Sequence, residues 1–164
     1  MKKLSFIIVV LLIVGVLAFC NDSEPDIEIK ATISPITEYE YNNLNYKDGA
    51  IDDYKLFKLD FHMKHDDSVK ERQIYIPDLM EIFNNIDDTA RFDNGNGSAQ
   101  DNQRVNFATY NRIAVFYSKG LSNDDIKNVF NDEKITVAWV NSKNEKVEKE
   151  YTIADFIEFS SEPG

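Results

Sequence analysis

The stretch "DNGNGSAQD", residues 93–101, holds the densest run of potential metal ligands in the chain. Calcium takes roughly six to eight oxygen ligands, and this run could offer Asp93, Asn94, Asn96, Ser98 and Asp101. Two glycines stand where the helix–loop–helix calcium motif needs ligands, and no glutamate follows at the closing position. Asn-Gly pairs form turns, so the sequence favours a plain loop over 87–102, functional or mobile, with calcium binding as the alternative.

Adjacent acids and histidines are the other candidates for chemistry. Four aspartate pairs resemble the carboxylates of hydrolases: Asp52-Asp53, Asp66-Asp67, Asp87-Asp88 and Asp124-Asp125. Neighbouring side chains diverge on a strand, so no pair forms a catalytic dyad by itself, and the last pair suits a helix start. His62 and His65, three apart on a predicted strand, point to opposite faces and disfavour a shared metal ion. No serine-hydrolase elbow or Walker loop occurs, and we predict no catalytic residue, metal site or cofactor.

Tyrosines cluster in one third of the chain, among acids and asparagines. Exposed tyrosine is a good contact residue for proteins and sugar rings. We therefore consider a binding patch formed by Tyr39, Tyr41, Tyr46 and Tyr54, against the alternative that these side chains pack beneath the N-terminal loops.

The only cysteine, Cys20, follows an uncharged apolar run from Leu4 to Phe19 that begins after Lys2 and Lys3. A charged start followed by an apolar core is the layout of a secretory signal peptide. The polar residues directly after Cys20 disfavour a buried core cysteine. A lone cysteine also provides no disulfide, so the exported domain must fold without one.

The residues Leu17-Ala18-Phe19-Cys20 resemble the lipobox of bacterial membrane lipoproteins. Leu17 and Ala18 match the family's pattern, whereas Phe19 stands where the family prefers Gly, Ala or Ser. The resemblance covers only the first twenty or so residues, and it implies diacylglycerol on the Cys20 thiol and cleavage just before it. The alternatives are an uncleaved membrane span, which would be short, and cleavage with full release. All three interpretations place the domain outside the cytoplasm, and the first anchors it at the cell membrane.

The expected organisation is a signal peptide over 1–19, a polar tether over 20–26 and one β-rich domain over 27–160. The chain carries a formal charge of −11, and removal of a leader with two lysines and no acid makes it more negative. Such acidity opposes binding to nucleic acid. The abundance of aromatic residues, 12% of the chain, argues against disorder.

Strict alternation marks the best predicted strand, residues 54–65, with Phe57, Leu59, Phe61 and Met63 on its dry face. Further strands are expected at 27–34, 73–76, 103–110, 112–118, 134–140 and 145–153, and residues 36–41 continue or pair with the first. Short helices are expected at 77–86 and 120–132, the second capped by Ser122 with Asp125.

These elements predict a mainly β domain: an immunoglobulin-like antiparallel sandwich of about seven strands with one or two short helices, after an N-terminal signal or anchor helix. The paired cysteines of true immunoglobulin domains are absent. We expect a non-catalytic, tethered binding module of the cell envelope, with another envelope protein or a cell-wall polymer as partner. The composition fits a Gram-positive source. The alternatives are an extracytoplasmic hydrolase, whose carboxylates converge only in the fold, and a calcium-dependent adhesion-like module.

Overall fold

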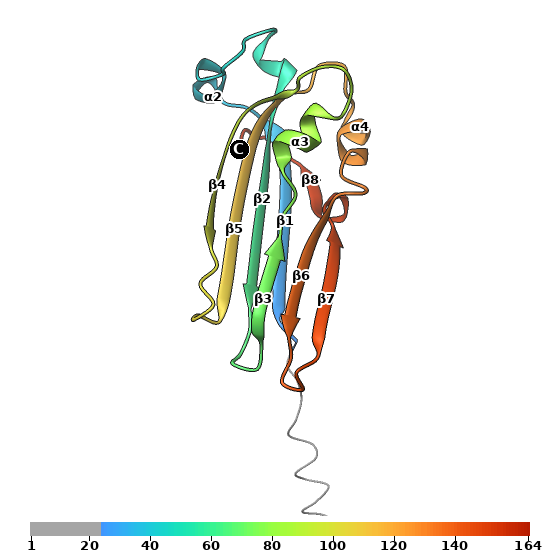
Figure 1. The fold of residues 1–164 in the computed structure, drawn as a ribbon. Helices are drawn as coiled ribbons and strands as arrows, with labels where there is room; N and C mark the ends of the chain where they lie inside the picture. Colours follow the sequence, from blue (N-terminus) through green and yellow to red (C-terminus); the bar gives the residue numbers. More distant parts are fainter. Residues whose placement is uncertain (1–23) are drawn as a thin grey trace, which may run out of the picture.

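The computed structural model describes residues 24–164, which form eight β-strands, three short α-helices and two 3-10 helices (Figure 1). The expectation of a mainly β chain is confirmed. The leader and Cys20 lie outside the described residues.

Five strands form the larger sheet, in the order β4-β5-β2-β1-β8. Their bounds are β1 Asp26–Pro35, β2 Tyr54–Lys64, β4 Phe92–Gln100, β5 Phe107–Tyr117 and β8 Ile157–Phe159. All neighbours are antiparallel except β1 and β8, which run parallel. The strand β1 starts at the lower end of the molecule in Figure 1 and runs towards the end that carries the helices.

Three antiparallel strands form the smaller sheet, in the order β3-β6-β7. Their bounds are β3 Lys70–Tyr75, β6 Lys134–Val140 and β7 Lys146–Thr152. One cluster of buried residues joins the two sheets, because it combines β2 side chains with Ile135, Val137 and Trp139 of β6. The main core therefore lies between the inner face of the larger sheet and the smaller sheet.

The predicted alternation of β2 is confirmed, since Phe57, Leu59, Phe61 and Met63 are all buried in the main core. Two helices close the core at the end opposite the start of β1 (Figure 1). The helix α3 (Leu79–Asn84) contributes Phe83, which stacks on Phe116 with ring centroids 4.2 Å apart. Phe130, which follows α4 (Asn123–Asn128), stacks on Phe57 with ring centroids 4.8 Å apart.

Local capping sets where these helices begin. Asp78 precedes α3 and accepts a hydrogen bond from the Met80 backbone. Ser122 and Asp125 form a reciprocal capping box at α4, as the sequence predicts.

Residues 36–41, predicted as strand, instead lead into the helix α2 (Glu38–Asn42), so that expectation is wrong. Thr37 and Glu40 exchange capping hydrogen bonds at its start, which satisfies backbone donors that a strand would have paired with a neighbour. The helix and the loop after it, with the 3-10 helix η1 (Ile51–Asp53), lie across the end of the larger sheet.

The predicted loop over 87–102 is also wrong for most of its length, because residues 92–100 form β4 at the edge of the larger sheet. After a register shift near Asp93, β4 pairs continuously with β5 from Asn94 to Gln100. The glycines suit this packing: a Cβ on Gly97 would lie 2.8 Å from the Arg112 guanidinium, and one on Gly95 would lie 2.7 Å from the Ile113 carbonyl. The two strands expected around Asn111 are one strand, β5.

Candidate functional site

The outer face of the larger sheet, opposite the main core, divides into two halves. Near the helices, Leu56 of β2 and Val115 of β5 are buried in a second core under Ile36, Leu44 and Tyr54. Two residues further along β2 on the same face, the side chains become polar, beginning with Lys58. The segment 36–53 stops short of this polar half, which stays open.

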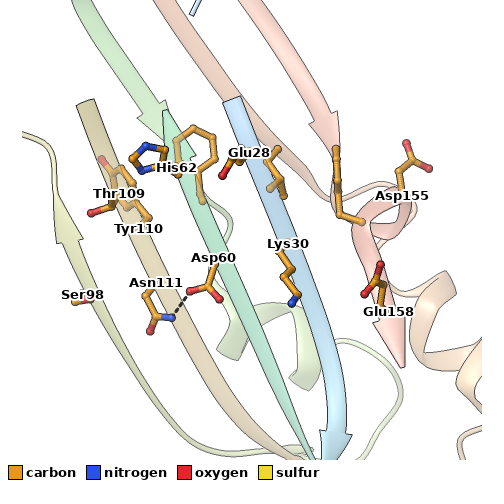
Figure 2. A pocket seen from close by; sticks show the side chains of 13 residues that line it. Glu28, Lys30, Asp60, His62, Ser98, Thr109, Tyr110, Asn111, Asp155 and Glu158 are labelled. Atoms are coloured by element: carbon orange, nitrogen blue, oxygen red, sulfur yellow. Dashed lines mark hydrogen bonds between the residues drawn. The ribbon is translucent and has the colours of Figure 1, made fainter. Parts of the chain in front are cut away.

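An open groove of about 800 Å³ runs over the polar half (Figure 2). Strand register explains how its wall is assembled, because directly paired residues in an antiparallel sheet share a face. In one row Glu28 pairs with His62, which pairs with Thr109. In the next row, Lys30 pairs with Asp60, then Asn111 and Ser98 follow on β5 and β4. At the far side, the 3-10 helix η2 (Ile153–Phe156) and β8 add Asp155, Phe156 and Glu158.

Asp60 lies at the centre of the groove and is held in place by its neighbours. The Asn111 side-chain amide donates to Asp60 at 2.7 Å, as Figure 2 shows, and the Lys58 ammonium lies 3.4 Å from its other oxygen. Asp60 and Lys58 are each about half exposed, so this ion pair is screened by water and adds little stability. The contacts fix the position of the carboxylate and leave it open to a ligand.

Five other charged or ionisable side chains of the groove form no hydrogen bond or ion pair within residues 24–164: Glu28, Lys30, His62, Asp155 and Glu158. Four carboxylates, those of Glu28, Asp60, Asp155 and Glu158, line the groove with one lysine. Such an arrangement can accept hydrogen bonds from hydroxyl or amine groups and favours a ligand with positive charge.

The structure separates the four predicted tyrosines. Tyr39 and Tyr46 are 77% exposed, whereas Tyr54 is 3% exposed and belongs to the second core. The Tyr54 hydroxyl donates to the Tyr46 carbonyl and accepts from the Asp48 backbone, and burial raises the pKa of this phenol. Tyr41 is half-buried against Tyr54, and its hydroxyl donates to the Gly49 carbonyl. Tyr54 is therefore closed to a ligand, and the binding patch stays a prediction for Tyr39, Tyr41 and Tyr46.

The oxygen ligands predicted over 93–101 are split between two ends of β4. Asp93 is buried and accepts hydrogen bonds from the Asn45 and Tyr46 backbones, which attaches the loop after α2 to the sheet. Asp101 accepts from the buried Arg72 guanidinium and from Tyr110. Burial, and then the bond to Asp101, raise the pKa of Tyr110 to about 12.

Within residues 24–164, no group of three or more histidine, cysteine, aspartate or glutamate side chains is arranged to hold a metal ion. Calcium binding by this segment stays a prediction. The carboxylates of Asp93 and Asp101 already bond to protein groups and lie at opposite ends of β4, which does not favour it.

One member of each aspartate pair has a structural contact. Asp53 accepts from the Ala50 backbone amide and pairs with Lys119, Asp67 accepts from Asn106, and Asp125 caps α4. Asp87 forms a two-pronged ion pair with the buried Arg91. The histidines also separate: His62 lines the groove, and His65 accepts from Arg72 at 2.5 Å.

Sequence reasoning did not single out the groove residues. The alternation over 54–65 places Lys58, Asp60 and His62 on one wet face, and that signal is correct. It does not say that Glu28, Asn111 and Glu158 become their neighbours, because strand pairing is a long-range property.

No family model matches the chain, and neither the curated proteins nor the solved structures contain a match to it. Among residues 24–164, no helix has the length and apolarity needed to cross a bilayer.

Proposed function

We propose that this chain is a lipid-anchored, extracytoplasmic binding module without catalytic activity, and that the groove on the outer face of the larger sheet is its binding surface. The observation that carries the proposal is the set of charged groove side chains that have no partner within residues 24–164. Other parts of the described chain hold ion pairs such as Arg72–Asp101, Arg91–Asp87 and Lys134–Glu150, whereas in the groove only Asp60 has a charged partner.

We further propose that the two sheets form an immunoglobulin-like sandwich. The strand orders β4-β5-β2-β1 and β3-β6-β7 match the two sheets of a constant-type immunoglobulin domain, with β8 added beside β1. Three features depart from that family: the inter-sheet disulfide is absent, the core tryptophan Trp139 lies on β6 rather than β3, and α4 stands between β5 and β6. This fold hosts many functions, so the proposed activity rests on the groove.

The anchor proposed at Cys20 would keep the groove close to the membrane. Glu24 is held against β7 by an ion pair of 2.6 Å with Lys149. At full extension, the four residue steps from Cys20 to Glu24 would reach about 14 Å at most. Glu28 and Lys30 lie four and six residues after Glu24, which adds about 20 Å at most.

The chemistry of the groove supports a polar partner that brings amine or hydroxyl groups. An envelope protein with a basic segment supplies amine groups, and a cell-wall polymer supplies hydroxyl groups. At one side of the groove, η2 contributes the half-buried aromatic ring of Phe156 to the lining.

The test compares two charge-matched double variants of the full chain in co-sedimentation with purified cell wall and in pull-downs from native membranes. Glu28→Gln with Asp60→Asn removes two groove carboxylates. Glu148→Gln with Glu150→Gln removes two exposed carboxylates of β7, away from the groove. We expect binding to fall at least about tenfold in the groove variant only. Equal binding by both variants and the unmodified chain would contradict the proposal.

The anchor has a separate test. Mass spectrometry of the native protein should find a diacylated N-terminal cysteine, and Cys20→Ser should abolish both the lipid and the cleavage before residue 20. An intact initiator methionine with a bare thiol in a cytosolic fraction would contradict the anchor and the location together.

A second candidate function, hydrolysis, is favoured by one observation: the fold brings carboxylates from β1, β2, η2 and β8 into one groove. Inverting glycosidases need two such groups about 6.5–9.5 Å apart, with one acting as acid and one as base. Turnover of cell-wall glycan that Asp60→Asn abolishes would favour the enzyme over the binding module.

A further inference from the structure

The edges of the two sheets differ in how they are protected against added strands. Exposed edges offer unpaired backbone groups, and proteins usually block them with charges, bulges, proline or short length. Of the four edge strands, β8 is only three residues long. The strand β3 carries Lys70, Glu71 and Arg72 beside a register shift, and β7 alternates lysine and glutamate.

The fourth edge, β4, lacks charge, proline and a bulge along most of its length, and its one local block is the Gly97 backbone amide, which donates to the Asn96 side chain at 2.6 Å and must exchange that bond on pairing. From Asn94 to Gln100 it is regular, largely exposed and free of charge and proline. This neutral strip is unusual in a chain with a formal charge of −11. It is therefore the edge where a second acidic copy can approach with the least local repulsion.

The sequence of this strip is complementary to itself. If two copies of β4 pair antiparallel about Gly97, Asn96 of each copy lies opposite Ser98 of the other, and Asn94 lies opposite Gln100. These outer-face pairs can exchange side-chain hydrogen bonds across the strands. On the inner face Gly95 meets Ala99 and Gly97 meets itself, so none of these paired residues carries a large side chain, and the Arg112 and Phe92 side chains lie against the two glycines from within the same chain.

An exposed aromatic lies beside the same edge. The Tyr46 backbone donates to Asp93 at 2.9 Å, so Tyr46 stands next to the first residues of β4. In the register centred on Gly97, Asp93 faces Asp101 of the other copy, and both carboxylates are already engaged within their own chain, Asp93 by backbone amides and Asp101 by Arg72. Tyr46, which is 77% exposed in the single chain, would thus pack against the β4–β5 turn of the second copy. The two-fold symmetry makes Tyr46 of the second copy form the same contact with the first.

We propose that β4 is a self-association edge, through which two copies of this chain join their larger sheets into one continuous sheet. The Asp26 ends then point in opposite directions, so anchored copies would lie with their strands along the membrane. The small side chains of β4 bury little area, which makes the association weak and reversible.

Sedimentation velocity of the full chain in detergent, from micromolar to near-millimolar concentration, tests the proposal. The unmodified chain should show a reversible monomer–dimer equilibrium. Asn96→Lys with Ser98→Lys places lysines opposite lysines and should weaken the dimer at least about tenfold. A control, Thr32→Lys with Thr136→Lys, adds the same charge to interior strands and should leave the equilibrium unchanged.

Charge complementation makes the test specific for this register. Asn96→Glu with Ser98→Glu should also be monomeric, yet mixing it with the lysine double variant should restore a heterodimer, since each lysine then faces a glutamate. Circular dichroism would verify that both variants are folded. A monomeric unmodified chain, a dimer that persists in both charged variants, or failure of the mixture to associate would each overturn the proposal.

Discussion

The two halves of the outer face of the larger sheet are built from the same strands, but one half is covered and the other is open. Leu56 and Lys58 lie two residues apart on β2 and point the same way, yet one is buried under the segment 36–53 and the other is half exposed. The difference shows that a change of side-chain chemistry along one strand decides where a covering loop ends and where an open surface begins.

The largest effect should come from Leu56→Ala, because Leu56 is only 5% exposed in the second core. We expect a loss of about 2–5 kcal/mol in the free energy of unfolding, measured by urea denaturation. The matched change Lys58→Ala, on the same strand and face, should cost no more than about 0.5 kcal/mol. Similar losses for the two variants would remove the distinction between the halves.

A smaller effect is expected from Tyr54→Phe, which keeps the ring and removes only the hydroxyl. The hydroxyl joins the Tyr46 carbonyl to the Asp48 backbone amide, so its loss should cost about 1–2 kcal/mol in urea denaturation. The control Tyr39→Phe alters an exposed side chain and should change stability by no more than about 0.5 kcal/mol. If the two substitutions proved equal, the Tyr54 hydroxyl would not fix the covering loop.

Beyond the covered half, an ion pair between the buried Arg91 and the partly exposed Asp87 should respond to pH. Arg91 donates to the Tyr117 and Lys119 carbonyls, and its hydrogen bonds to Asp87 lower the pKa of that carboxyl to about 2. Because the folded pKa lies below the unfolded value near 3.8, the stabilisation is present above that value and is lost as pH falls towards 2.

Thermal unfolding of the unmodified chain and of Asp87→Asn between pH 6 and pH 2 measures this contribution. The difference between their melting temperatures should be constant above about pH 5 and shrink below pH 4. A difference that stays constant down to pH 2 would show that Asp87 is not the titrating group.

The smallest effect belongs to the open half. Asp60→Asn should change the free energy of unfolding by no more than about 0.5 kcal/mol, because the carboxylate is half exposed, while it weakens binding in the groove. Stability is measured in urea and binding by co-sedimentation with cell wall. A large loss of stability would show that Asp60 holds the sheet together instead of facing a ligand.

Elements with a local signal could be predicted from the sequence. The alternation of β2 and the capping box of α4 both depend on residues within a few positions of one another, and both are confirmed. The box Thr37–Glu40 gave an equally local signal for α2, which a strand interpretation of the following tyrosines obscured.

Elements that depend on distant partners could not be predicted. The run of asparagine and glycine in β4 is extended because β5 supplies its hydrogen bonds, and β5 continues through Asn111 because that residue pairs with Asp60 of β2 and Ser98 of β4. The groove is of the same kind, since its wall is made where Glu28, Asp60 and Asn111 meet on three neighbouring strands.

The place of β1 within the larger sheet has a mechanical consequence. This strand leads directly from the segment proposed as the tether, and it pairs with β2 over ten residues, from Asp26 to Pro35. Tension between an anchored N-terminus and a ligand held on β2 and β5 would pull along the strands and load these hydrogen bonds in shear, together rather than in sequence. The smaller sheet lies outside that line of force, so the protein should resist pulling through the long β1–β2 ladder.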